Sequence, residues 1–168
     1  KGNQAVIGGA ISDDNPNNDV TITNATISGN TVTNRGGGLN TLSSGVLTSL
    51  NNSILINNTG PTGADLFVDG SGLTQSQNIV ESCAGSCPSF HSSATDVLGT
   101  LTTCTVNGVE LCYYPVAQGS DADGAADAGQ APATDICGTT RPGSPSIGSS
   151  EATFDPCAGD TEAPTAVC

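Results

Sequence analysis

Apolar residues in the first 80 positions occur in short β-branched runs that glycine and asparagine separate. Examples are Val20–Thr23, Thr26–Ser28 and Val46–Thr48. No stretch carries the i, i+3, i+4 apolar spacing of an amphipathic helix. The pattern therefore predicts an all-β chain of short strands joined by tight turns.

The same pattern returns after 27 residues. Pairs related by this shift are Thr21 and Thr48, Asn24 and Asn51, Ile27 and Ile54, Gly36 and Gly63, and Leu39 and Leu66. Gly8 to Ile11 lie 28 residues before Gly36 to Leu39. A period between about 20 and 50 residues is typical of repeat proteins, whose units bury their apolar faces only by stacking on one another.

Strands this short, repeated at this period, predict a right-handed parallel β-helix (β-solenoid) of about three to four coils. In such a stack Ile27 would lie on Ile54 in the core, and Asn24 would lie on Asn51 at a corner. The glycines at 36–38 and 63 would occupy turns that need a positive φ or a close backbone approach.

Composition changes near residue 82, because all seven cysteines and seven of the nine prolines follow it. We therefore divide the chain into β-helix coils (1–82) and a Cys-rich, acidic C-terminal cap or extension (83–168). Three Phe, two Tyr and no Trp do not favour a wide globular core. The narrow interior of a solenoid needs fewer large side chains.

Seven cysteines in an acidic chain rich in threonine and asparagine indicate an oxidising compartment, which predicts an extracellular or cell-surface location. Cys83 and Cys87 could close a tight local loop. The remaining candidates for disulfides are Cys104, Cys112, Cys137, Cys157 and Cys168. Of Cys137, Cys157 and Cys168, one has no disulfide partner, and we expect it to be Cys168. No apolar run is long enough to span a membrane.

The Asn107-Gly108 pair predicts a β-hairpin. A two-residue turn would set Cys104 opposite Leu111, whereas a three-residue loop would set it opposite Cys112. If Cys104 and Cys112 are bonded, the longer loop is implied.

Several stretches resemble a known group of proteins. NATISGNT (24–31), GGGLN (36–40) and LNNSILINNT (50–59) are similar to secreted bacterial right-handed β-helix proteins of the polymorphic outer membrane protein and choice-of-anchor Q type. ATDICGTTRP (133–142) and PSIGSSE (145–151) resemble the A-T-D-x-x-G-x-x-R-P and D-I-G-A-x-E ending of that group.

The resemblance implies a surface or extracellular β-helix and supplies no established catalytic residue. Two departures from the group are Cys137 inside the first ending motif and the absence of an aspartate before Ile147. Residues 160–168 resemble the opening of an Ig-like or HYR-type module, which indicates an excerpt of a longer surface protein.

A net charge of −13 with Lys1, Arg35 and Arg141 as the basic side chains argues against nucleic-acid binding. Polysaccharide-cleaving β-helices need carboxylates, and in the lyases also a base, that converge on the substrate. The acidic group at residues 13, 14 and 19 is typical of an exposed turn instead. We therefore expect no catalytic residue and a non-enzymatic structural or adhesive module; the alternative is a polysaccharide-binding or polysaccharide-cleaving β-helix.

Calcium is the one cofactor that the sequence suggests. Asp121, Asp123 and Asp127 alternate around the turn residue Gly124, partly like an EF-type loop. The glutamate at position twelve of such a loop is absent, and a plain acidic surface loop explains the same residues.

Two further features concern surface chemistry. The sequons at Asn24, Asn51 and Asn57 are glycosylation candidates, although stacking at a turn explains the first two as well. Threonine rows raise the question of ice binding, but the shift of 27 places Thr21 on Thr48 and Thr23 on Leu50. That break argues against a flat Thr-x-Thr ladder.

Residues 5–11 already have the pattern of a coil, so no capping element precedes the stack. Open strand edges favour pairing with another chain. We therefore expect a homo-oligomer formed by end-to-end stacking, which would propagate as a filament. Surface glycans are the other expected partners.

Overall fold

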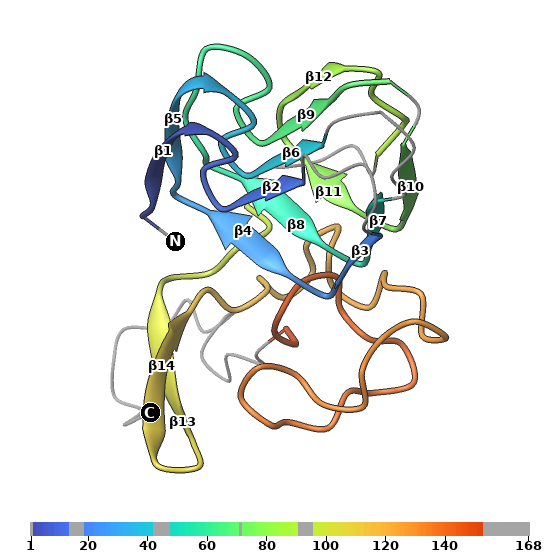
Figure 1. Cartoon of the computed structure of the whole chain (residues 1–168). Coiled ribbons are helices and arrows are strands. Elements are labelled where there is room, and N and C mark those ends of the chain that lie inside the picture. Colours follow the sequence, from blue (N-terminus) through green and yellow to red (C-terminus); the bar gives the residue numbers. More distant parts are fainter. Residues whose placement is uncertain (1, 14–18, 42–47, 71, 91–95, 153–168) are drawn as a thin grey trace.

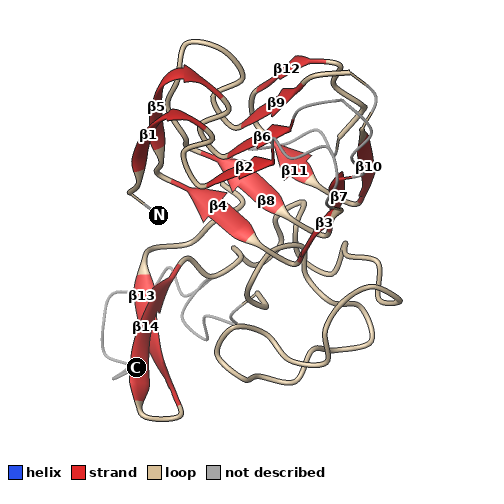
Figure 2. Cartoon of the chain, viewed as in Figure 1, coloured by secondary structure: helices blue, strands red, loops and turns tan. Residues whose placement is uncertain are grey.

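The computed structural model describes residues 2–13, 19–41, 48–70, 72–90 and 96–152. These residues form fourteen β-strands and no helix, which confirms the prediction of an all-β chain (Figure 2). Within the same ranges there is therefore no helix of the length and hydropathy needed to cross a membrane.

Twelve of the strands form four parallel sheets. The first sheet pairs β1 (Gln4–Ile7) with β5 (Thr31–Arg35), and the second contains β2 (Ile11–Asp13), β6 (Leu39–Thr41), β9 (Leu66–Val68) and β12 (Cys83–Gly85). The third contains β3 (Val20–Thr23), β7 (Thr48–Asn51) and β10 (Leu73–Ser76), and the fourth β4 (Thr26–Ser28), β8 (Ile54–Ile56) and β11 (Ile79–Val80).

The chain visits these sheets in the same order on each pass, so neighbouring strands of a sheet come from consecutive passes (Figure 1). On the third pass the first sheet is continued by single bridges from Thr59 and Thr62 to β5. β12 lies just after the predicted boundary at residue 82 and still pairs with β9. The remaining strands, β13 (Thr102–Val106) and β14 (Val109–Tyr113), form an antiparallel hairpin.

The register differs from the predicted one by one residue over much of the stack. Thr21 pairs with Ser49, and Ile27 pairs with Leu55, so the predicted stacking of Thr21 on Thr48 and of Ile27 on Ile54 is wrong. Successive side chains of a strand point to opposite faces. The shift of one residue therefore turns Ile54 away from the interior.

An extra residue in β5 explains the change of offset. Thr31 bridges to Thr59, and Arg35 bridges to Thr62. Four residues of β5 therefore span the same length as three residues of the next pass. β1 also shows a register shift against β5. After this extra residue the offset between β6 and β9 is 27, and the predicted pairing of Leu39 with Leu66 is confirmed. The offset falls to 25 where β7 pairs with β10 and β8 with β11.

Two apolar clusters lie on opposite faces of the β4–β8–β11 sheet. The interior cluster consists of Ile22, Ile27, Leu39, Leu50, Leu55, Leu66 and Val68. The outer cluster joins Ile54, Ile56 and Ile79 to Val97, Val116, Ala122 and Ile147 of the C-terminal region. Burial on both faces explains why the run Ile54–Ile56 is apolar without interruption.

The predicted turn glycines are confirmed. Gly36 and Gly63 have φ values of 63° and 52°, in the region that glycine favours. Gly37 lies so close to the next pass that a Cβ atom would sit 2.2 Å from the carbonyl oxygen of Ala64.

Gly37→Ala should therefore lower the free energy of unfolding by about 3 kcal/mol, because a backbone carbonyl cannot move aside without disturbing the strand pairing around it. Chemical denaturation would measure the loss. Gly143→Ala is the matched control, since nothing lies within 4 Å of the added Cβ. Equal effects of the two substitutions would contradict the close approach.

Candidate functional site

A column of side-chain amides, buried at Asn30 and Asn58 and exposed at Asn3, crosses the stack. The Nδ2 group of Asn3 donates to Oδ1 of Asn30 at 3.1 Å, and that of Asn30 donates to Oδ1 of Asn58 at 2.9 Å. Asn58 Nδ2 then donates to Oδ1 of Asp65 at 2.7 Å, and the backbone N–H of Asn58 reaches the same oxygen at 3.0 Å. The amide column therefore ends in a carboxylate.

Asp65 lies at a polar hollow of about 410 Å³. The hollow is lined by Asn57, Asn58, Thr59, Ala64, Asp65, Glu81 and Ser82. Asp65 is 1% exposed, whereas Glu81 is exposed and its Oε2 accepts the backbone N–H of Asn57 at 2.9 Å. Two carboxylates from different passes thus share one hollow.

Burial raises the pKa of Asp65 to about 6. The negative charge of Glu81 adds to the increase, while hydrogen bonds from Asn58 and from the backbone of Ser82 oppose it. A carboxyl that is half protonated near pH 6 beside a second carboxylate can act as a proton donor. The lining residues include no lysine or arginine.

Sequence reasoning missed this pair. Asp65 directly precedes β9, and Glu81 directly follows β11, so the two residues belong to different strand ends. The sequence feature that could have indicated them is an acidic residue directly beside a short apolar run, which both Asp65 and Glu81 have. Their convergence depends on the shorter third pass, in which Cys83 pairs with Leu66.

A second amide column anchors the C-terminal region. Asn52 Nδ2 donates to Oδ1 of Asn24 at 3.2 Å, and both residues have a φ of 49°. Asn24 Nδ2 in turn donates to the carbonyls of Ser146 and Gly148. Stacking of Asn24 at a corner is thus confirmed, but its side-chain partner is Asn52 and not Asn51.

This column bears on the glycosylation candidates. Asn24 is 6% exposed, and its amide nitrogen is engaged, so it offers no free acceptor for a glycan. Asn51 is half-buried on β7, and Asn57 is exposed with a φ of 58°. Of the three sequons, Asn57 is the most accessible.

The predicted calcium ligands hold separate turns. Asp123 Oδ2 accepts the N–H of Gly119 at 2.8 Å. Asp127 accepts from the side chain of Gln130 and the N–H of Gly129, and these bonds lower its pKa. Asp121 is exposed. In the described ranges no three acidic, histidine or cysteine side chains gather as a metal site, and calcium binding stays a prediction.

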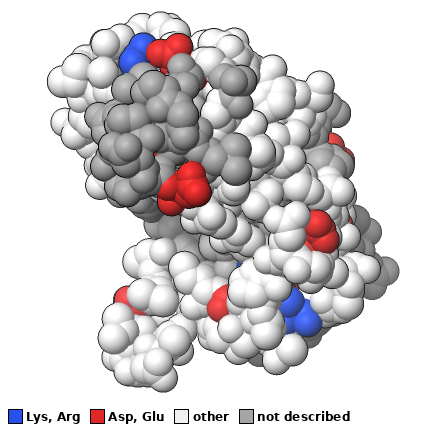
Figure 3. All heavy atoms as spheres, turned by 45° about the vertical axis from the view of Figure 1, so that its right-hand side comes forward, with Lys and Arg blue, Asp and Glu red and all other residues white. Residues whose placement is uncertain are grey.

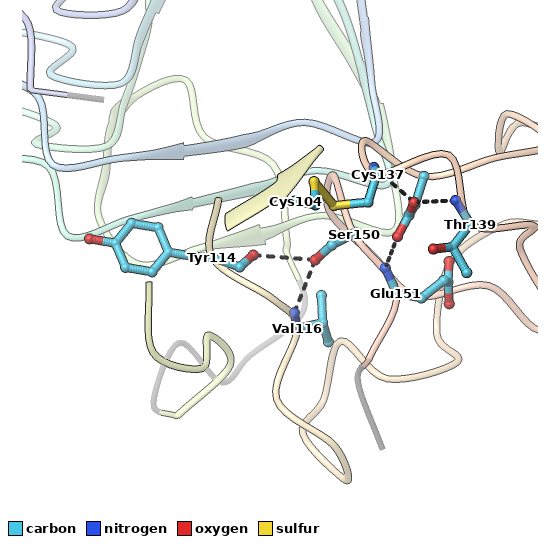
Figure 4. Close-up of a disulfide and its surroundings, with 8 residues drawn as sticks. Cys104, Tyr114, Val116, Cys137, Thr139, Ser150 and Glu151 are labelled. Carbon is cyan, nitrogen blue, oxygen red and sulfur yellow. Dashed lines mark hydrogen bonds between the residues drawn. A yellow bond between two sulfur atoms is a disulfide. The ribbon is translucent and has the colours of Figure 1, made fainter. Parts of the chain in front are cut away.

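Two disulfides are present among the described residues. Cys83 bonds to Cys87, as predicted, and Cys104 bonds to Cys137 (Figure 4). The alternative in which Cys104 bonds to Cys112 is wrong, because the hairpin has the two-residue turn and sets Cys104 opposite Leu111. Cys112 is exposed and forms no disulfide with another described cysteine, and Cys157 and Cys168 lie outside the described residues.

The stretch that resembles the group's ending forms a polar clamp. Arg141 is buried, pairs with Glu151, and donates to the carbonyls of Ser146 and Gly148. Asp135 accepts the N–H groups of Cys137, Thr139 and Glu151 (Figure 4). The two carbonyls that Arg141 contacts are the same ones that Asn24 contacts.

Comparison with known proteins finds no matching family model, no matching curated protein and no matching solved structure. The resemblance to secreted bacterial β-helix proteins therefore stays a prediction.

Asp65 should make stability fall as the pH rises from about 4 to about 6. In this range the folded state keeps the proton and the unfolded state loses it, so the free energy of unfolding should drop by about 3 kcal/mol. Urea unfolding at several pH values would measure the slope. Asp65→Asn should flatten it and Asp121→Asn, at an exposed carboxyl, should not; an unchanged slope in Asp65→Asn would contradict the shifted pKa.

The disulfides should differ in their contributions to stability. Cys104–Cys137 spans 33 residues and Cys83–Cys87 spans 4, so loop-closure entropy gives roughly 4 against roughly 2 kcal/mol. Replacing both cysteines of each pair with serine and measuring unfolding would test the order. In the variant that lacks Cys104–Cys137, hydrogen exchange should rise over residues 97–152. Faster exchange confined to residues 1–82 would contradict the stabilisation of the C-terminal region by this disulfide.

Proposed function

We propose that the chain is a non-enzymatic module of an extracellular or cell-surface protein, built as a right-handed parallel β-helix and used for structure or adhesion. The observation that carries the proposal is the strand order, in which each pass of the chain adds one strand to the same parallel sheets. Such a stack grows by repetition and presents long flat faces.

The buried amide columns support a structural role. Each side-chain amide is hydrogen-bonded to the pass beside it, which favours a stiff stack of fixed register. The two disulfides are compatible with an oxidising, extracellular environment. End-to-end stacking into a filament, surface-glycan partners and calcium binding stay predictions.

One observation favours the alternative, a β-helix that acts on polysaccharides. Asp65 and Glu81 share a hollow, and the raised pKa of Asp65 suits a general acid. We rank this function second because the hollow has no aromatic residue on which a sugar ring could stack.

Incubation with a panel of polysaccharides, followed by analysis for new reducing ends and unsaturated sugars, separates the two functions. We expect no product from the oxidised chain. Product formation that is lost in both Asp65→Asn and Glu81→Gln, and kept in Asp121→Asn, would contradict the non-enzymatic function and support the alternative.

A further inference from the structure

The outward face of the β3–β7–β10 sheet carries a grid of small polar side chains. Alternation along the strands turns Ile22 and Leu50 into the interior and the residues beside them outward. One outward row is Thr21, Ser49 and Thr74, and the other is Thr23, Asn51 and Ser76. None of the six is fully buried.

The grid exists because of the observed register. With the offset of 27 the rows would break at Leu50, but with the pairing of Thr23 to Asn51 they continue. All three strands pair over four residues without a shift, so the face carries no bulge. Ser49 and Thr74 lie close enough for their hydroxyls to hydrogen-bond at 3.0 Å.

The face is uncharged although the chain has a net charge of −13. Figure 3 brings the side of the molecule with these strands forward, and its described residues are mostly uncharged, with the acidic groups in isolated patches. The six side chains are hydroxyls and one amide, which both donate and accept hydrogen bonds. A partner that matches them is uncharged, polar and itself repeating.

Frozen water has this chemistry. Tetrahedral water with O–H···O distances of about 2.75 Å places second-neighbour oxygens about 4.5 Å apart. Paired strands repeat their side chains every 4.7–4.9 Å or so, which is close to this spacing. A crystalline polysaccharide is the other repeating partner, but flat sugar surfaces favour aromatic platforms, and the grid has none.

We propose that the outward face of the β3–β7–β10 sheet is a binding surface for ice. The proposal deepens the adhesive function proposed above and rests on it, since the ordered solid is then the surface to which the module attaches. Binding uses the side chains of the sheet itself and needs no catalytic group, metal or second chain.

The test is partition of the oxidised chain into slowly growing ice, together with inhibition of ice recrystallisation. Wild type should enter the ice, and Ser49→Tyr, at the centre of the first row, should lower the bound fraction by about tenfold. Thr105→Tyr, on the exposed polar face of the β13–β14 hairpin, is the matched control and should bind like wild type. Thermal unfolding confirms that both variants fold.

The proposal would be overturned if the fraction of wild type that enters the ice is no larger than that of an inert protein of similar charge. Equal losses in the two variants would overturn it as well, because binding would not use this face. Retention on insoluble neutral polysaccharide, lost in Ser49→Tyr, would assign the face to that partner instead. The proposed non-enzymatic function would be contradicted by a different result, the release of sugar products, so the two failures are distinguishable.

Discussion

Hydrogen bonding between buried side-chain amides of consecutive passes is the constraint on which the stack depends. A buried amide without a partner costs about 1–3 kcal/mol, which is more than a satisfied one contributes. Asn30 and Asn58 are 1% and 8% exposed, so a slip of one residue would break the buried bond from Asn30 Nδ2 to Asn58 Oδ1 and leave these amides only the bonds within their own pass. The amide columns therefore fix the register, and the register decides which side chains face inward, which support the C-terminal region and which meet solvent.

The same register divides the faces of the stack between structure and surface chemistry. At the β4–β8–β11 sheet it turns Ile54 and Ile56 outward, where residues 97–152 cover them. Arg141 and Asn24 then converge on the carbonyls of residues 146 and 148, so the C-terminal region is held by polar bonds as well as by apolar packing. The β3–β7–β10 sheet keeps its small hydroxyl side chains on the outside and is the face that we propose for adhesion.

Much of the fold follows from local sequence, and the rest depends on long-range geometry. Short β-branched runs predict the strands, and the glycines predict the turns at Gly36 and Gly63, because both signals act within a few residues. The offset of 28 is visible between Gly8–Ile11 and Gly36–Leu39, and the pairing of Ile11 with Leu39 confirms it. For β3 and β4 it could not be predicted, since repeated asparagines at 51, 52, 57 and 58 allow two alignments, and only the extra residue in β5 distinguishes them. The Asp65–Glu81 hollow and the Cys104–Cys137 bond join segments that meet only through tertiary packing.

Engineered disulfides between consecutive passes would test the register most directly. Strands that pair lie 4.7–4.9 Å or so apart, within the Cα separation that a disulfide accepts. With Thr21→Cys, the outward side chain at position 49 is the paired partner, whereas position 48 points inward. Peptide mapping by mass spectrometry should find the crosslink in Thr21→Cys with Ser49→Cys and not in Thr21→Cys with Thr48→Cys. The reverse result would contradict the register and, with it, the faces derived from it.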